Sequence, residues 1–265
     1  MTERELKIHE RLKHDYYYVH NQGYEVFGVF LQGSQNYQLD YENSDIDTKC
    51  IVLPSAEDLI LNKPPVSTTL ILEDNSHIDL KDIRLMWQCF KKQNVNYLEI
   101  LFTDFYYVPG YFESSWSVLR FMREAIAHID NYAAVNCIVG MVLEKNAALC
   151  HPYPTLKDKI DKYGYDNKQL HHIIRCREFL DKYIAGMPFV DCLIPYDKNY
   201  LISVKANYRY DLDQAKAIAK EAVDYVKAVK QNYLANHERS INETTIKQLD
   251  NILVDILTSC WGIDI

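Results

Sequence analysis

The chain has 265 residues, enough for one large domain or two modest ones, and its hydrophobic fraction of 48% can supply a substantial core. The formal net charge of −8 argues against broad electrostatic binding to nucleic acid, which needs clustered Lys and Arg, but it does not exclude a local basic groove. Seven cysteines, with no pair at CxxC spacing, argue against a zinc site or a disulfide framework and predict a reducing, cytoplasmic compartment.

The first half of the chain alternates between helix and strand patterns. Residues 1–11 are highly charged and lack the apolar region of a signal peptide, which also favours the cytoplasm. A leading helix is predicted at Leu6–Tyr18. Short runs of β-branched and aromatic residues, bounded by turn residues, predict strands. The predicted strands are Glu25–Leu31, Ile46–Leu53, Thr68–Leu72 and Ser76–Leu80, followed by a helix at Asp82–Gln93 and by Tyr97–Phe102, whose pattern fits helix or strand.

From about Ser114 the pattern becomes helical, with apolar residues three and four positions apart. The most apolar stretch, Tyr132–Leu143, is too short to span a bilayer and predicts a buried helix, so no membrane partner is expected. The stripe in Asp211–Tyr233 indicates core packing or, alternatively, a seam for a partner helix. The predicted helices of this half are Ser117–Ile129, Tyr132–Leu149, Asp166–Ile184, Asp211–Tyr233 and Asn242–Ser259.

These patterns together predict an α+β fold. A small mixed sheet flanked by helices is expected in residues 1–112, and a helical domain that closes a cleft is expected in residues 113–265. Pro109 and Gly110 interrupt the pattern and mark the predicted boundary.

Three carboxylates are predicted to converge at one edge of the sheet. Alternate side chains of a strand face the same side, so Asp45 and Asp47 would project together while Ile46 faces the core. Asp79 lies between two apolar residues of another strand and would emerge on the face opposite to them. If the two strands are neighbours, the three carboxylates meet.

Carboxylates so close repel one another and need a cation or protons to coexist. Mg²⁺ prefers oxygen ligands and keeps room for waters and substrate phosphates. Gly33 and Ser34 follow a strand and would offer amide donors to an anion at a tight turn. Each feature alone has an ordinary interpretation: a turn, a solvated Asp-x-Asp, or a buried hydrogen-bonded Asp79. Their ordered combination is much more specific.

The combination resembles the nucleotidyltransferase superfamily related to DNA polymerase β. The run from Gly33 to Tyr37 and the run from Glu42 to Asp47 resemble its bacterial and phage predicted-nucleotidyltransferase branch, of the RNA-repair-pathway type. Two later segments, Asn94–Leu101 and Gly164–Arg175, also resemble that branch, with Val95 departing where proline is usual. The resemblance covers about residues 25–184.

The resemblance implies a metal-dependent transfer of a nucleoside monophosphate from an NTP, with ATP as the expected nucleotide, to a hydroxyl. Asp45, Asp47 and Asp79 would bind Mg²⁺ or Mn²⁺, and Asp79 would also orient or deprotonate the attacking hydroxyl. Gly33 and Ser34 would hold the β- and γ-phosphates.

A basic face on a later helix gives a separate clue. Lys168, His172 and Arg175 are spaced i, i+4 and i+7, so they share one helix face that could bind a triphosphate or an anionic acceptor. The alternative is a solvated face with salt bridges. Lys49 alternates with Asp47 and either pairs with the carboxylates or touches phosphate.

Two classes of function compete. The first is an active nucleotidyltransferase whose acceptor is an RNA end, a protein hydroxyl or a small molecule. The second is a non-catalytic nucleotide-binding regulator or an antitoxin-like protein-interaction module. The intact Gly33-Ser34 turn and the three carboxylates favour the enzyme, because a binding module does not require them.

Overall fold

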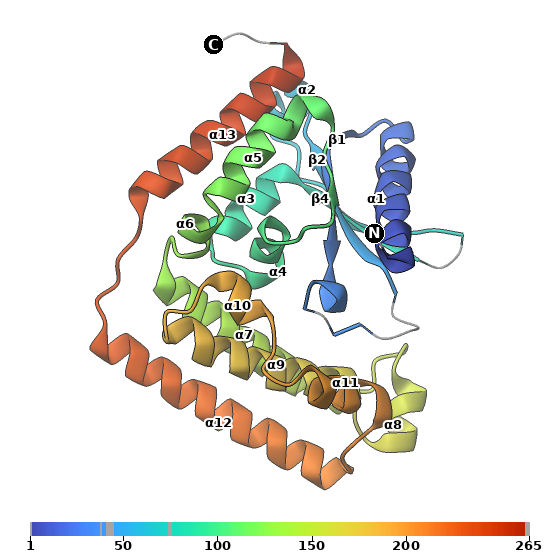
Figure 1. Cartoon of the computed structure of the whole chain (residues 1–265), viewed down its shortest axis with the longest axis vertical. Helices are drawn as coiled ribbons and strands as arrows, with labels where there is room; N and C mark the ends of the chain where they lie inside the picture. Colours follow the sequence, from blue (N-terminus) through green and yellow to red (C-terminus); the bar gives the residue numbers. More distant parts are fainter. Residues whose placement is uncertain (1, 38, 41–44, 74–75, 263–265) are drawn as a thin grey trace. The chain divides into compact units, whose positions relative to one another are not determined.

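A computed structural model describes residues 2–37, 39–40, 45–73 and 76–262 (Figure 1). The chain forms two compact units. The sheet unit comprises Met1–Asn36, Asn43–Ile129 and Asn242–Ile265, and the helical unit comprises Tyr37–Glu42 and Asp130–Ile241. Within the described residues, none of the helices combines the length and apolar character needed to cross a membrane.

The sheet of the first unit is mixed, which confirms the predicted α+β class. Its strand order is β3-β4-β2-β1-β5. The central strands β2 and β4 run parallel, and every other neighbouring pair is antiparallel. The strands are β1 (Glu25–Gln32), β2 (Asp47–Leu53), β3 (Ser67–Ile71), β4 (His77–Asp82) and β5 (Tyr106–Tyr107).

One face of this sheet is closed by α1 (Glu3–Asn21), which lies along it in Figure 1. The helix buries Leu12 and Val19 against alternate strand residues such as Val29 and Leu80. The period of two in the strands therefore puts one set of side chains in this core and leaves the other set for the opposite face.

The opposite face carries the aromatic core and most of the remaining helices of the unit. The ring of Trp116 lies 4.7 Å from that of Phe30, and Phe27 lies 5.4 Å from Phe112, measured between ring centroids. Trp87 Nε1 donates a hydrogen bond to the carbonyl of Leu249 at 2.8 Å. The helices of this unit, besides α1, are α2 (Ala56–Ile60), α3 (Ile83–Lys91), α4 (Val95–Leu98), α5 (Glu113–Phe121), α6 (Arg123–Ala127) and α13 (Glu243–Trp261).

The compact units divide the chain at positions other than the expected boundary near residue 112. Pro109 and Gly110 do interrupt the pattern, but α5 continues the core of the sheet through Trp116. The C-terminal helix α13 also belongs to the sheet unit, because it packs on α3 and α5. Sequence periodicity predicts where a helix forms, but it does not say which core its apolar face joins.

Two segments have a helical form that the sequence did not specify. Tyr97–Phe102, predicted as helix or strand, is helical in α4 and the 3₁₀ turn Glu99–Leu101. The single helix predicted at Ser117–Ile129 is instead two helices, α5 and α6, which adjoin at Met122 (φ −86°, ψ 0°).

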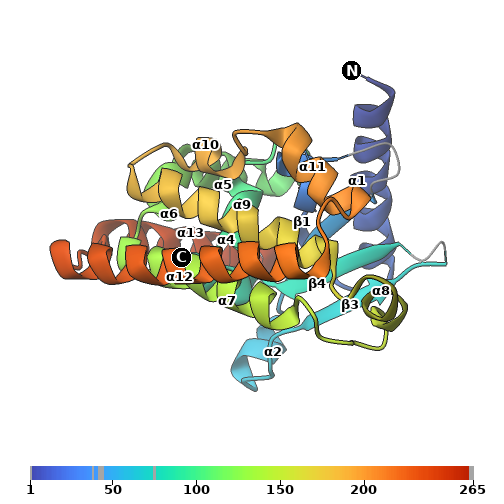
Figure 2. The ribbon, with the colours of Figure 1, turned by 90° about the horizontal axis from the view of Figure 1, so that it is seen from below.

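The helical unit is built on three helices that pack side by side: α7 (Asn131–Ala148), α9 (Asn167–Ile184) and α12 (Leu212–Asn236) (Figures 1 and 2). The predicted stripe of α12 is core, since Ala215, Ala219 and Val226 are fully buried. The unit's shorter helices are α8 (Lys157–Tyr163), α10 (Phe189–Leu193) and α11 (Lys198–Asn207).

Candidate active site

The turn after β1 brings Gly33 next to Asp47. Gly33 has φ +81°, a left-handed conformation that glycine adopts without steric cost, and it starts the 3₁₀ turn Gly33–Tyr37 that also contains Ser34. Gln32 and Asp47 are partners in the ladder between β1 and β2. A Cβ atom on Gly33 would lie 3.4 Å from Oδ2 of Asp47. The glycine turn and the first carboxylate of β2 are therefore direct neighbours.

Side-chain amides and a hydroxyl hold this turn in place. Asn36 Nδ2 donates to the carbonyl of Leu31 at 2.7 Å, and Thr103 Oγ1 donates to Asn36 Oδ1 at 2.8 Å. Gln35 Nε2 donates to the carbonyl of Asp45 at 2.7 Å. The turn is thus tied to the end of β1, to a distant loop and to the segment that leads into β2. Sequence reasoning assigned no role to these side chains.

Asp79 stands on the strand beside β2, on the same face as Asp47. Lys49 and Asp79 are register partners in the parallel β2–β4 ladder, and Lys49 is two residues after Asp47. Ile78 and Leu80 are buried while Asp79 is partly exposed, as predicted. Asp79 Oδ2 lies 3.3 Å from Lys49 Nζ. The expected pairing of Lys49 with a carboxylate is confirmed.

A second lysine completes the environment of Asp79. Lys81 Nζ lies 3.0 Å from Asp79 Oδ1, and the side chain of Lys81 is more exposed than that of Lys49. Lys49 Nζ also donates to the carbonyl of Asn96 at 3.3 Å and lies 4.0 Å from the ring centroid of Tyr97. Burial lowers the pKa of Lys49 below its ordinary value, although the Asp79 carboxylate opposes that shift. Asp79 therefore faces two ammonium groups.

The predicted metal ligands are placed individually rather than as a group. Asp45 is exposed and precedes β2, Asp47 borders the turn, and Asp79 faces the lysines. Among the residues that the structure describes, no three His, Cys, Asp or Glu side chains are gathered as a metal site. The motif residues 42–44 lie outside the described residues. The metal site of Asp45, Asp47 and Asp79 stays a prediction.

The donor chemistry nonetheless fits a hard cation. All three side chains offer carboxylate oxygens, the ligand type that Mg²⁺ and Mn²⁺ take. Asp47 has no ion pair among the described residues. Asp79 already has counter-charges in the ammonium groups of Lys49 and Lys81. Binding of a metal would replace ammonium groups by a divalent ion at Asp79.

The residues of the predicted basic face on α9 differ in exposure. Lys168 is exposed, His172 is partly buried and Arg175 is buried. The Arg175 guanidinium lies 3.9 Å from the ring centroid of Tyr37, in the same unit. No Asp or Glu of the described chain lies within ion-pair distance of Arg175. A solvated face with salt bridges does not describe Arg175, because it is a buried cation without a carboxylate.

Two adjacent histidines of α9 are held neutral. Burial lowers the pKa of His172 well below its ordinary value, and the charge of Arg175 acts in the same direction. His171, which the sequence did not single out, is buried, and its Nδ1 donates to the carbonyl of Leu201 at 3.0 Å. Burial lowers the pKa of His171 to about 3. At neutral pH the positive charge of this helix face comes from Lys168 and Arg175.

Comparison with known proteins gives little beyond this geometry. No family model matches the chain, and none of the curated proteins matches it. One similar solved structure is a nucleotidyltransferase-like protein from Exiguobacterium sibiricum 255-15. The sequence identity is 12%, 83% of this chain and 75% of that chain are covered, and the TM-score is 0.29. At this TM-score the two backbones do not superpose closely, so the likeness assigns no function.

Proposed function

We propose that the chain is a metal-dependent nucleotidyltransferase that transfers a nucleoside monophosphate from an NTP, with ATP as the expected nucleotide, to a hydroxyl acceptor. The observation that carries the proposal is the contact of the Gly33 turn with Asp47, together with Asp79 on the neighbouring strand, which lies on the same face and pairs in register with Lys49, two residues after Asp47. A purely structural domain has no need for a left-handed glycine against one carboxylate and for a second carboxylate on the adjacent strand.

The turn would bind the triphosphate. Gly33 has no side chain between its backbone and the Asp47 carboxylate, so phosphate oxygens can approach the amides of Gly33 and Ser34 closely. The hydrogen bonds of Gln35 and Asn36 fix the turn before substrate arrives. A preorganised set of donors stabilises developing negative charge without a reorganisation cost during the reaction.

Asp79 would position the acceptor. Its carboxylate accepts the proton of the hydroxyl while the hydroxyl oxygen attacks the α-phosphorus. The bond from the α-phosphorus to the bridging oxygen of the β-phosphate breaks, and pyrophosphate leaves with that electron pair. Lys49 holds the Asp79 side chain at the sheet face, since its own ammonium is fixed by Asn96 and Tyr97.

Mg²⁺ or Mn²⁺, held by Asp45, Asp47 and Asp79, would supply charge neutralisation for the phosphates and favour ionisation of the attacking hydroxyl. An NTP with one divalent ion still carries negative charge. Arg175, a buried cation without a carboxylate partner in the described chain, and the exposed Lys168 are the candidates to neutralise it from the helical unit. The roles of Lys168, His172 and Arg175 in NTP binding are part of this proposal.

The decisive experiment incubates the protein with α-labelled NTPs, Mg²⁺ or Mn²⁺, and three acceptors: RNA, protein and small hydroxyl compounds. Label in any product, together with released pyrophosphate, supports the proposal. The non-catalytic alternative has one observation in its favour, the neutralisation of Asp79 by Lys49 and Lys81. It predicts NTP binding without pyrophosphate release under every metal condition, and that result would overturn the enzyme.

A further inference from the structure

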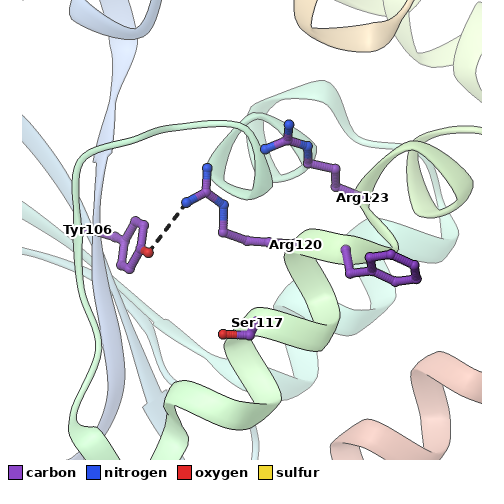
Figure 3. Close-up of a pocket in the computed structure, with 5 residues that line it drawn as sticks. Tyr106, Ser117, Arg120 and Arg123 are labelled. Carbon is purple, nitrogen blue, oxygen red and sulfur yellow. Dashed lines mark hydrogen bonds between the residues drawn. The ribbon is translucent and has the colours of Figure 1, made fainter.

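A depression of about 520 Å³ lies in the sheet unit at the edge strand β5, away from the carboxylates (Figure 3). Its walls are β5, the end of α5 and the start of α6. The lining residues are Tyr106, Ser117, Arg120, Phe121 and Arg123. Figure 3 shows Arg120 and Arg123 extending in the same direction over the depression, with Ser117 one turn earlier on α5. None of these residues belongs to the proposed metal or NTP site.

The two arginines provide accessible positive charge. Arg120 Nη2 lies 2.9 Å from Asp104 Oδ1, and Arg120 Nη1 is within 3.4 Å of the Tyr106 hydroxyl. The Asp104 side chain is 86% exposed, so this ion pair is weak and can be exchanged for another anion. Arg123 stacks at 5.3 Å on the ring of Phe102 and has no carboxylate in ion-pair distance among the described residues. Guanidinium groups bind phosphate in a bidentate manner.

Phe121 provides a flat apolar surface at the rim of the same depression. Its side chain is 91% exposed, the most exposed of the large hydrophobic side chains described. Val118, one turn earlier on α5, is also exposed. Stacking of bases on exposed aromatic rings next to cationic groups is how proteins bind single-stranded nucleic acid without sequence preference.

The depression is linked to the candidate active site through the sheet. Tyr106 pairs with Phe30, Phe30 with Lys49, and Lys49 with Asp79, so all four share one face. Three strand spacings separate Tyr106 from Asp79, which is about 14 Å.

The wall of the depression also leads toward the Gly33 turn. Phe102, under Arg123, and Asp104, beside Arg120, flank Thr103, and Thr103 donates to Asn36 of that turn. A chain of several nucleotides seated on Arg120 and Arg123 would therefore have its end in reach of the carboxylates.

We propose that this depression binds a single-stranded oligonucleotide, with phosphates on Arg120 and Arg123 and a base on Phe121, as the acceptor of the transfer. The acceptor role rests on the proposed function, whereas the binding itself can be measured without NTP or metal. The net charge of −8 limits binding to this local pair of arginines, so affinity is modest and depends on salt.

Fluorescence anisotropy of labelled ten-nucleotide RNA and DNA single strands, in EDTA and without NTP, tests the binding. Neutralisation of two phosphates predicts a slope of log K against log salt of about −1.4, falling to about −0.7 in Arg123→Gln. Phe121→Ala should weaken binding about five- to tenfold through lost stacking. Arg177→Gln, which removes a partly exposed arginine of the helical unit paired with Glu221, is the matched control and should change neither quantity.

The results distinguish a failure of the oligonucleotide site from a failure of the proposed transfer reaction. Absence of oligonucleotide binding, or binding that Arg123→Gln and Phe121→Ala leave unchanged, overturns the site even if label is transferred to a small hydroxyl compound. Equal binding of a phosphoserine peptide overturns the oligonucleotide as ligand. Binding that depends on both residues supports the site, and if no acceptor is then labelled it is the proposed transfer that fails.

Discussion

The candidate site residues of the two units differ in how their charges are balanced. In the sheet unit, the carboxylate of Asp79 is matched by Lys49 and Lys81 on the same sheet face. In the helical unit, Arg175 is buried on the ring of Tyr37, and no carboxylate in the described chain pairs with it. One unit thus offers acidic groups that can exchange their counter-charge, and the other offers a cation that lacks one.

This difference indicates which kind of ligand would stabilise each unit. A buried cation without an anion is costly, so binding of phosphate near Arg175 would stabilise the helical unit. Carboxylates that are paired with ammonium groups would be stabilised less by phosphate than by a divalent cation. We therefore expect a metal ion to bind in the sheet unit and an anionic group to bind near Arg175 of the helical unit, and each variant below tests one part of this expectation.

The largest effect is expected in the sheet unit. Asp47→Asn removes the carboxylate next to the Gly33 turn, and transfer should fall by at least about 10³-fold, because one preorganised charged contact in the transition state is lost. Folding should be preserved, because Asp47 has no ion pair among the described residues that the substitution would remove. Rates of pyrophosphate release and melting curves measure the two quantities.

The matched control is Asp250→Asn, which removes a carboxylate of α13 that pairs with Lys91 on the surface. It should transfer at the parent rate. If Asp47→Asn transfers as well as this control, Asp47 does not take part in the reaction and the metal has no place in the sheet unit.

The next effect is expected in the helical unit. Lys168→Ala should reduce NTP affinity or transfer by about 10²-fold and leave the melting temperature unchanged, because the side chain is exposed. Arg175→Ala should lower the melting temperature as well, since a buried side chain and its contact with Tyr37 are lost. Calorimetric titration with NTP and thermal unfolding of both variants give the comparison.

Lys220→Ala is the control for Lys168, because Lys220 is an exposed lysine of α12 whose only ion pair in the described chain is with Asp224. A Lys168 variant that binds and transfers NTP like this control would leave the helical unit as scaffold alone.

Much of the sheet unit follows from sequence patterns. The alternation around Asp79 predicted its strand and its exposed face, and the spacing of Asp47 and Lys49 predicted a lysine on the same face as Asp47 that pairs with a carboxylate or touches phosphate. The two-residue strand β5 could not be predicted, because its existence depends on pairing with β1 across the fold. The same is true of Thr103, which bonds to Asn36 from 67 residues away.

In the helical unit, periodicity gave the helices but not the burial of their polar groups. A helical repeat places Lys168, His172 and Arg175 on one face. It does not reveal that Tyr37, far along the chain, covers Arg175. His171 was missed because its burial depends on α11, through the carbonyl of Leu201, and no local pattern of α9 signals that contact.

A smaller effect concerns the dependence of stability on pH. The folded-state pKa of His171 is about 3, below the ordinary value of 6.5, so the unfolded chain binds the proton first as the pH falls. The contribution of His171 to stability is therefore fully present above pH 6.5 and decreases by about 1.4 kcal/mol for each pH unit between pH 6.5 and about pH 3. His172 adds a loss in the same direction. The nearby Arg175, Lys205 and Lys168 charges support the low pKa of His171.

Urea unfolding of the parent and of His171→Asn at pH 7 and pH 5.5 measures this loss. The variant should lose less stability than the parent between the two pH values. His151→Asn is the control, because His151 is an exposed histidine of the same unit and should leave the pH dependence unchanged. If His171→Asn and the parent lose the same stability between the two pH values, folding does not lower the pKa of His171.

The smallest effect compares two glycines with the same backbone conformation, one in each unit. Gly33 has φ +81° and Gly164, at the C-terminus of α8, has φ +80°. Replacement by alanine costs about 1–2 kcal/mol at either position, because a Cβ is disfavoured in left-handed backbone. At Gly164 the Cβ also comes within 2.8 Å of Leu212 Cδ2, whereas at Gly33 it meets Asp47 Oδ2 at 3.4 Å. Chemical unfolding should show the larger loss for Gly164→Ala.

Activity should rank the same two variants in the reverse order. The Cβ of Gly33→Ala stands in front of the Asp47 carboxylate, where the phosphates are proposed to bind, so NTP affinity should fall although the fold is only slightly weakened. Gly164→Ala strains α8 and its contact with Leu212, and it should bind NTP like the parent at a temperature where both remain folded. Calorimetric titration of the two proteins decides the matter. If both variants lose NTP affinity in proportion to their loss of stability, the Gly33 turn contributes to folding alone and the proposed phosphate site is wrong.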